Sequence, residues 1–393
     1  MSSIFLPEYA LKCIRLIEEN GYSAWAVGGC VRDLLLGKQA HDVDLASSAP
    51  PEKIKNIFER VYDTGIAHGT LTVCVDDHLI EVTQYRTDGT YTDHRHPDQV
   101  KSVDRIEDDL ARRDFTVNAM AWHPERGLID LFGGQQDLER KLIRCVGDPE
   151  KRFEEDALRI LRAFRFASKL GFTIEENTKK IALEKATILK KVSTERIQKE
   201  LLQILSGETP EILSLLLMYG GLHHLGLTYQ NADLSVLRRV DSNDVAVLLA
   251  GLCFLSNVDT QDFCRNLKTS KKISKRACML NQELGLDLVT DLYECKKRIG
   301  FFGEDYVSFL RYRCAVLREN CDDAIAMADQ ILKQKEPYRV DMLALNGNDL
   351  KSLGISNKKI GEVLQILLDR VMRDPALNTK EKLISMLSVP EKV

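Results

Sequence analysis

The hydrophobic pattern of the chain changes near residue 148, and this change restricts the folds that the chain can adopt. Before it, short β-rich runs such as "SAWAV", "TLTVCV" and "LIEVTQY" are interleaved with helical stretches such as "PEKIKNIFERVY". After it, Leu, Ile, Lys and Glu recur with the period of an α-helix. The sequence therefore predicts an α+β domain followed by all-helical domains.

Turn-forming stretches divide the helical part further. "SGETPE" interrupts the helical pattern near residues 206–210, and "KKRIGFFGEDY" interrupts it near 296–305. A chain of 393 residues also exceeds the ~250–300 residues at which a single core stops growing. We therefore expect four domains, which span residues 1–147, 148–207, 208–300 and 301–393.

The composition indicates a soluble cytoplasmic protein. Hydrophobic residues make up 44% and charged residues 29%, and no run of about 18 apolar residues marks a membrane span. The first stretch, "MSSIFLPEYALKCIRLIEENGY", reads as an amphipathic helix rather than a signal peptide. The ten cysteines form no CxxC pair, which argues against a zinc site and against a disulfide framework.

The stretch "WAVGGCVRDLLLG" predicts a strand that enters Gly28 and Gly29 and a helix that ends at Gly37. The missing side chains of the two glycines let a ligand approach the backbone, and the amides at a helix start favour phosphate. Arg32 could add a forked donor. A turn without a ligand is the alternative, because a Gly-Gly pair alone is weak evidence.

Two aspartates follow this helix, separated by one valine. In a strand, residues i and i+2 face the same side, so Asp42 and Asp44 would present both carboxylates together. Paired carboxylates repel unless a cation lies between them, and their hard oxygens suit Mg²⁺. Glu81 in "LIEVTQY" is the candidate third ligand. The alternative is a strand edge with solvated acids.

Four stretches carry a family resemblance: "GGCVRDLLLG", "HDVDLA", "RRDFTVNAMAW" and "EEDALRILRAFRFASKLGF". Together they resemble the class II tRNA nucleotidyltransferases, which are the CCA-adding enzymes and the related bacterial poly(A) polymerases. The resemblance covers residues 20 to 175 and continues more weakly through "VSTERIQKEL" and "LNGNDLKSLGISNKKIGEVL". No HD phosphohydrolase motif is visible in the C-terminal half, which is similar to the shorter bacterial form.

The resemblance implies a mixed-sheet nucleotidyltransferase head followed by a helical neck, body and tail. It implies template-independent addition of C, C and A to the 3′ end of tRNA from CTP and ATP. In this family the residues that match Asp42 and Asp44 hold the metal ions. The residues that contact the nucleotide match Gly29, Arg32, Arg113, Asp156, Arg159, Arg162 and Arg165.

The expected helix at 154–167 could select the base. Cytosine and adenine both present an amino donor beside a ring-nitrogen acceptor, whereas uracil and guanine present the reverse. Asp156 would accept a hydrogen bond from the amino group, and Arg159 would donate one to the ring nitrogen, with Arg162 in support. The alternative is a solvated face of Glu/Asp–Arg ion pairs, which are common on helices.

Two more stretches of the first domain are candidates for ligand contact. In "RRDFTVNAM", Arg113 would bind phosphate or sugar and Asp114 would fix it by an ion pair, although a turn before a strand is an ordinary alternative. The polar stretch at 85–99, "YRTDGTYTDHRHPDQ", has the pattern of a mobile loop. It resembles the family's flexible loop, and its presence favours an enzyme that can add A.

The charge distribution leaves the RNA contacts open. The net charge of −4 argues weakly against a protein coated in nucleic acid, so local clusters matter more. The most basic helical stretches are "KTSKKISKR" at 268–276 and "KKR" at 296–298, which could contact phosphates or be solvated. A poly(A) or A-only enzyme and a non-catalytic RNA-binding protein remain as alternatives. The sequence does not decide between a monomer and a homodimer.

Overall fold

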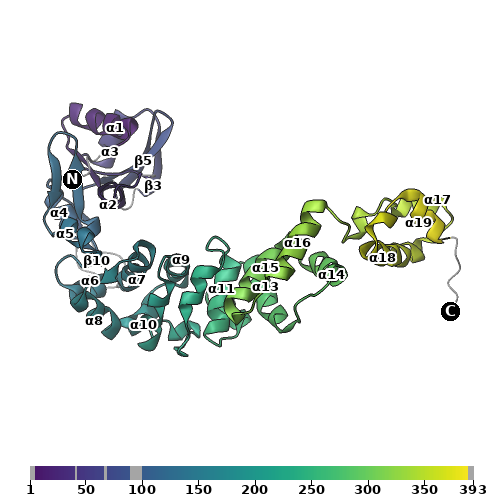
Figure 1. Cartoon of the computed structure of the whole chain (residues 1–393). Helices are drawn as coiled ribbons and strands as arrows, with labels where there is room; N and C mark the ends of the chain where they lie inside the picture. Colours follow the sequence, from purple (N-terminus) through teal and green to yellow (C-terminus); the bar gives the residue numbers. More distant parts are fainter. Residues whose placement is uncertain (1–4, 40–41, 66–68, 89–99, 388–393) are drawn as a thin grey trace. The chain divides into compact units, whose positions relative to one another are not determined.

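The computed structural model describes residues 5–39, 42–65, 69–88 and 100–387 (Figure 1). The chain forms two compact units. The first comprises Met1–Arg238 and Ser256–Thr269, and the second comprises Arg239–Leu255 and Ser270–Val393. Each unit is described by itself below. Within the described ranges, no helix is long and apolar enough to cross a bilayer.

The first unit begins with a seven-stranded sheet of order β3-β4-β5-β2-β1-β8-β9. Its strands are β1 (Ala24–Val27), β2 (Asp44–Ser47), β3 (Val61–Gly65), β4 (Thr70–Val75), β5 (His78–Gln84), β8 (Met120–His123) and β9 (Gly127–Asp130). The pair β2–β5 is parallel and the other neighbours are antiparallel. The predicted α+β class with a mixed sheet is therefore confirmed.

Three helices pack on strands β1, β4 and β8 of this sheet. Helices α1 (Glu8–Glu19) and α3 (Pro51–Ile57) pack on each other and on β4 (Figure 1). Helix α2 (Gly29–Leu35) follows β1 directly and packs on β1 and β8. The chain leaves α2 through Gly37, whose φ of +72° places it in the left-handed region, as its predicted role at the helix end requires.

Several segments of the first unit differ from the pattern of the sequence. The alternating "FTVNAMAW" contains a 3₁₀ turn (Thr116–Asn118) before β8 begins, and the Thr116 hydroxyl donates to the buried Asp137. Strand β10 (Leu142–Ile143) pairs with β11 (Thr173–Ile174) in a separate two-stranded sheet rather than in the main sheet. The helical part is thus not purely helical at its start.

The 85–99 stretch lies largely outside the described residues. Its flanks form a small hairpin of β6 (Arg86–Asp88) and β7 (Val100–Ser102). Helix α4 (Ile106–Ala111) follows this hairpin, and α5 (Gly134–Glu139) follows β9. The predicted loop function stays a prediction.

The helix predicted at 154–167 is two helices, α6 (Pro149–Glu155) and α7 (Leu158–Leu170). The break occurs at Asp156, whose backbone is extended and whose carboxylate accepts the N–H of Leu158 at 3.0 Å. An aspartate that bonds to the backbone in this way competes with helix continuation. These apolar side chains of the segment are fully buried: Ala157, Ile160, Leu161, Phe164 and Ala167.

Helix α7 packs mainly on α9 (Thr194–Leu205). The remaining helices of the first unit are α8 (Glu176–Glu184), α10 (Leu213–Met218) and α12 (Thr260–Asn266). The second unit contains α11 (Val245–Leu255), α13 (Lys271–Gln282), α14 (Leu292–Phe302), α15 (Tyr306–Leu317), α16 (Asp322–Gln334), α17 (Gly347–Ser352), α18 (Asn357–Arg373) and α19 (Lys380–Leu387). From residue 175 onward the described chain contains no strand.

One of the two basic stretches does not fit the predicted contact with phosphate. In "KKR", Lys296 is only 2% exposed, and its ammonium group bonds to Glu336 at 2.7 Å and to the Met372 carbonyl at 2.8 Å. Lys297 is exposed but is paired with Glu294. Lys296 therefore joins α14 to α18 and to the segment that follows α16, and it is too buried to contact RNA.

Candidate active site

A cavity of about 760 Å³ lies in the first unit, between the sheet and helices α7 and α9. Of the predicted site residues, these line it: Gly28, Gly29, Arg32, Asp44, Glu81, Arg113, Asp114, Asp156, Arg159, Arg162 and Arg165. Asp42 precedes β2, is exposed and is not among the lining residues. The lining contains nine basic and four acidic side chains, so the cavity suits a polyanion.

The glycine turn brings the backbone of β1 close to an arginine. Gly28 has φ of +73°, and a Cβ at this position would lie 3.0 Å from Nη1 of Arg113. The left-handed backbone favours glycine at this position, because other residues rarely adopt a positive φ. Arg32, one turn along α2, donates to Asn118 at 2.7 Å and to Asp33 at 2.8 Å.

The carboxylates gather where β2 pairs with β5. Asp44 lies opposite Glu81 in the parallel register. Burial raises the pKa of the Asp44 carboxyl to about 6, the neighbouring Glu81 adds to this shift, Arg113 opposes it, and Asp42 adds a smaller increase. Three acids thus influence one another, and a divalent cation would relieve their repulsion. Among the described side chains, no group of three His, Cys, Asp or Glu forms a complete metal site.

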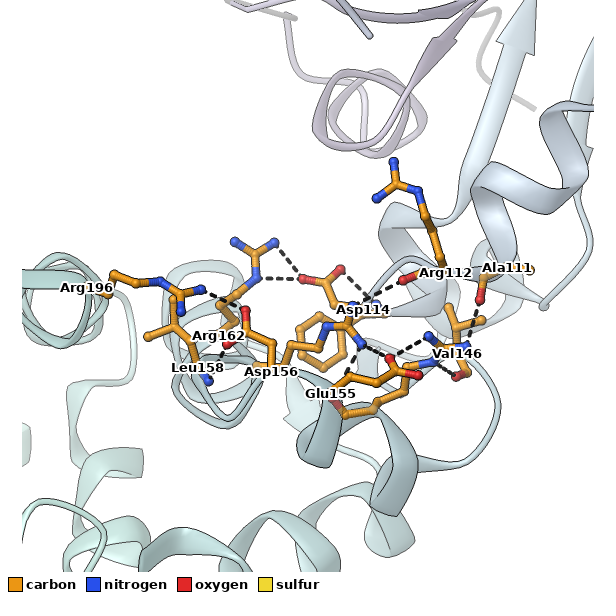
Figure 2. A network of polar contacts seen from close by, with 12 residues as sticks. Ala111, Arg112, Asp114, Val146, Glu155, Asp156, Leu158, Arg162 and Arg196 are labelled. Carbon is orange, nitrogen blue, oxygen red and sulfur yellow. Dashed lines mark hydrogen bonds and ion pairs between the residues drawn. The ribbon is translucent and has the colours of Figure 1, made fainter. Parts of the chain in front are cut away.

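Asp114 does not pair with Arg113 as predicted. Its carboxylate accepts the Nε–H of Arg162 at 2.7 Å (Figure 2), and burial would raise its pKa, but the charges of Arg162 and Arg159 hold the pKa below its ordinary value. Arg113 pairs with Asp109 at 3.0 Å, because these residues lie four apart on and just after α4. Asp114 is therefore paired with an arginine of α7 and not with Arg113.

Asp156 and Arg159 also have partners other than each other. The Asp156 carboxylate accepts Nη2 of Arg196 at 2.7 Å and the N–H of Leu158 at 3.0 Å (Figure 2). Arg159 pairs with Glu155 at 2.6 Å and donates to the Arg112 carbonyl at 3.2 Å. Asp156 and Arg159 are therefore held by different partners, and both side chains line the cavity.

Sequence reasoning missed several residues that build the cavity. Arg196 lies 40 positions after Asp156 and Asn118 lies 86 positions after Arg32, so neither pairing leaves a signal in local spacing. In the sequence, Phe166 is one of several apolar residues of a helical stretch, and nothing in the pattern indicates that it lines the cavity. Lys169 and Arg112 also line the cavity.

Two family models match the first unit, one before α7 and one after it. The model described as "Poly A polymerase head domain" matches residues 24–144. The model described as "Probable RNA and SrmB- binding site of polymerase A" matches residues 171–228. The first covers the sheet and the second begins just after α7.

Whole-length relatives share one name. The CCA-adding enzyme of Levilactobacillus brevis is 35% identical over 398 residues, which cover 97% of each chain. That of Enterococcus faecalis is 35% identical over 96% of this chain and 94% of the relative. The crystal structure of the Bacillus stearothermophilus CCA-adding enzyme in complex with CTP has a TM-score of 0.81 and 30% identity, and covers 98% of both chains. The chain belongs to the family of CCA-adding enzymes, which are tRNA nucleotidyltransferases.

Proposed function

We propose that this chain adds C, C and A to the 3′ end of tRNA from CTP and ATP and releases pyrophosphate. The observation that carries the proposal is the cavity itself. Its carboxylate wall, Asp44 and Glu81, and its base-reading candidates, Asp156 and Arg159, share one strongly basic chamber. The chamber suits a nucleoside triphosphate, whose negative charge and polar base both need partners.

The acidic residues fit a divalent cation. Burial raises the pKa of the Asp44 carboxyl, and the nearby Glu81 and Asp42 add to this shift. Hard oxygen ligands of this kind suit Mg²⁺. Asp42 and Asp44 would hold the ion, with Glu81 as the candidate third ligand. Bound there, Mg²⁺ supplies activation of the attacking hydroxyl and neutralisation of charge on the leaving pyrophosphate.

The arginines would bind and orient the triphosphate. Arg32, Arg113, Arg162 and Arg165 line the cavity and offer forked donors that match phosphate oxygens. The open backbone at Gly28 and Gly29 would let the triphosphate approach closely. Positioned in this way, the α-phosphate faces in-line attack by the tRNA 3′-hydroxyl, and the protein contributes orientation and electrostatics.

Asp156 and Arg159 would read the base from held positions. A carboxylate offers about four lone-pair sites, and the Asp156 contacts with Arg196 and Leu158 use two of them. The Asp156 carboxylate can therefore accept a hydrogen bond from the amino group of C or A while Arg196 stays in place. Arg159 is fixed by Glu155 and would donate to the ring nitrogen, with Arg162 in support.

We also propose the assignment of the remaining parts. Residues 1–147 would be the catalytic head, 148–207 the neck that reads the base, 208–300 the body, and 301–393 the tail that binds tRNA. All ten cysteines are described and none is in a disulfide, which fits a reducing compartment such as the cytoplasm.

An incorporation assay on tRNA that lacks its CCA end tests the proposal. With CTP alone we expect addition of two nucleotides, and with CTP and ATP together we expect addition of three. An enzyme that adds only A, or long runs of A, would give a different product, and this alternative is favoured by the match to a poly(A) polymerase head model. No incorporation at all, with tRNA still bound, would favour a non-catalytic RNA-binding protein.

A further inference from the structure

Phe166 lies among three arginines at one wall of the cavity. The guanidinium carbon of Arg165 is 4.0 Å from the centroid of the Phe166 ring, and those of Arg32 and Arg162 are each 5.4 Å away. Arg32 comes from α2, whereas Arg162 and Arg165 come from α7. One aromatic ring therefore contacts cations from two separate elements of the site.

Each arginine has an anionic partner of its own. Arg162 pairs with Asp114, Arg165 pairs with Glu200 at 2.8 Å, and Arg32 pairs with Asp33 at 2.8 Å. These partners lie on different elements, so ion pairing alone fixes each guanidinium separately. All three guanidinium groups lie near the Phe166 ring, whose negative face attracts each cation while adding no charge that would compete with a phosphate.

The ring is not open to a nucleobase. Phe166 is 7% exposed, Arg165 lies over the ring, and Phe115 packs against it edge-to-face at 5.7 Å between centroids. A stacking role for the base would require a free face. The contacts point instead to a role that acts through the arginines.

We propose that Phe166 is a positioning residue for the triphosphate of the incoming nucleotide. Its ring holds the guanidinium groups of Arg32, Arg162 and Arg165 together at the cavity wall, against the mutual repulsion of three positive charges. The inference rests on the proposed function, because it takes a nucleoside triphosphate as the ligand of this cavity. Since the triphosphate is common to CTP and ATP, Phe166 acts equally on both.

The test compares Phe166→Leu with Phe166→Tyr in the full-length chain, in steady-state addition to tRNA lacking CCA. Leucine keeps an apolar side chain but removes the ring, so we expect the KM for CTP and for ATP to rise about tenfold while kcat stays within about threefold. Tyrosine keeps the ring, and its KM should stay within about twofold of the unmodified chain. A Phe166→Leu variant with unchanged KM values overturns the proposal.

Binding of inorganic tripolyphosphate, measured by calorimetry, separates positioning from folding. The probe carries the anionic part of the nucleotide without ribose or base, so Phe166→Leu should weaken it by the same factor as KM. Phe164→Leu is the matched control, because Phe164 is fully buried on the same helix. It should lower the melting temperature and leave tripolyphosphate affinity unchanged. Equal loss of affinity in both leucine variants overturns the proposal.

The outcomes also distinguish this inference from the proposed function. A chain that adds no nucleotide, yet loses tripolyphosphate affinity in Phe166→Leu but not in Phe164→Leu, supports the positioning role and contradicts the proposed function. A chain that adds CCA with the same KM in both leucine variants supports the proposed function and contradicts the positioning role.

Discussion

The carboxylate of Asp156 is bound to the guanidinium of Arg196, with 2.7 Å between Oδ2 and Nη2. Asp156 lies at the break between α6 and α7, and Arg196 lies in the first turn of α9. Both side chains line the cavity. The carboxylate proposed to read the base is therefore oriented by a residue from another helix, and we expect Arg196 to influence base selection.

Replacing Arg196 tests that relation. In Arg196→Ala the Asp156 carboxylate loses a charge-assisted bond worth ~1.5–3 kcal/mol, so we expect kcat/KM for CTP and ATP to fall about ten- to a hundredfold. We expect UTP and GTP to be rejected less strictly. Competition assays with all four nucleotides measure both effects. Lys199→Ala, an exposed change on the same helix, is the control, and equal discrimination in the two variants would contradict the role of Arg196.

Replacing the proposed metal ligands should separate chemistry from RNA binding. Asp42→Ala or Asp44→Asn would remove a proposed ligand of the divalent cation, so incorporation should fall by about three orders of magnitude. The affinity for tRNA, measured by filter binding, should stay within about twofold. Asp63→Asn, an exposed aspartate in the same sheet, should keep full activity. Normal turnover in Asp44→Asn would refute the metal assignment.

The local parts of the site were predictable from the sequence, and the parts that depend on distant contacts were not. Gly28 and Asp44 were found because a turn and a short strand have fixed spacing. The partners of Asp114 and Asp156 lie 48 and 40 residues away, at Arg162 and Arg196, and only the packing of α7 against α9 and the head brings them close.

The helix break at Asp156 illustrates the same limit. The apolar period runs from Phe153, before the break, through Ala157 to Ala167, so periodicity predicts one helix across the break. At the break the Asp156 carboxylate accepts the backbone N–H of Leu158 and also the guanidinium of Arg196 from α9. Tertiary contacts thus override local propensity at the point where the base would bind.

Asp109 should make folding sensitive to acid. Its carboxylate is 1% exposed, so burial would raise its pKa, but the charges of Arg112 and Arg113 outweigh burial and hold the pKa below its ordinary value. A lowered pKa contributes stability that is present above the ordinary pKa of 3.8 and is lost as the pH falls through the folded-state value. Asp109→Asn breaks a buried pair, which should cost ~3–5 kcal/mol near pH 7.

Urea unfolding at a series of pH values measures this dependence. The difference between the unmodified chain and Asp109→Asn should stay constant from about pH 8 to about pH 5 and shrink below about pH 4. Asp108→Asn is the control, because Asp108 is exposed on the same helix. A difference that grows with falling pH would contradict the assigned sign.

The two basic stretches should respond differently to mutation. Lys271 and Lys275 are exposed on one face of α13, one helical turn apart, whereas Lys296 is buried against Glu336. If the α13 lysines contact tRNA phosphates, Lys271→Ala/Lys275→Ala should raise the Kd for tRNA and reduce the slope of log K against log salt by about 0.7–0.9 for each lost contact. Lys296→Met should instead lower the free energy of unfolding by roughly 3–5 kcal/mol, because Glu336 loses its partner. Among variants that remain folded, a reduced salt slope in Lys296→Met and an unchanged slope in the α13 double variant would reverse this assignment.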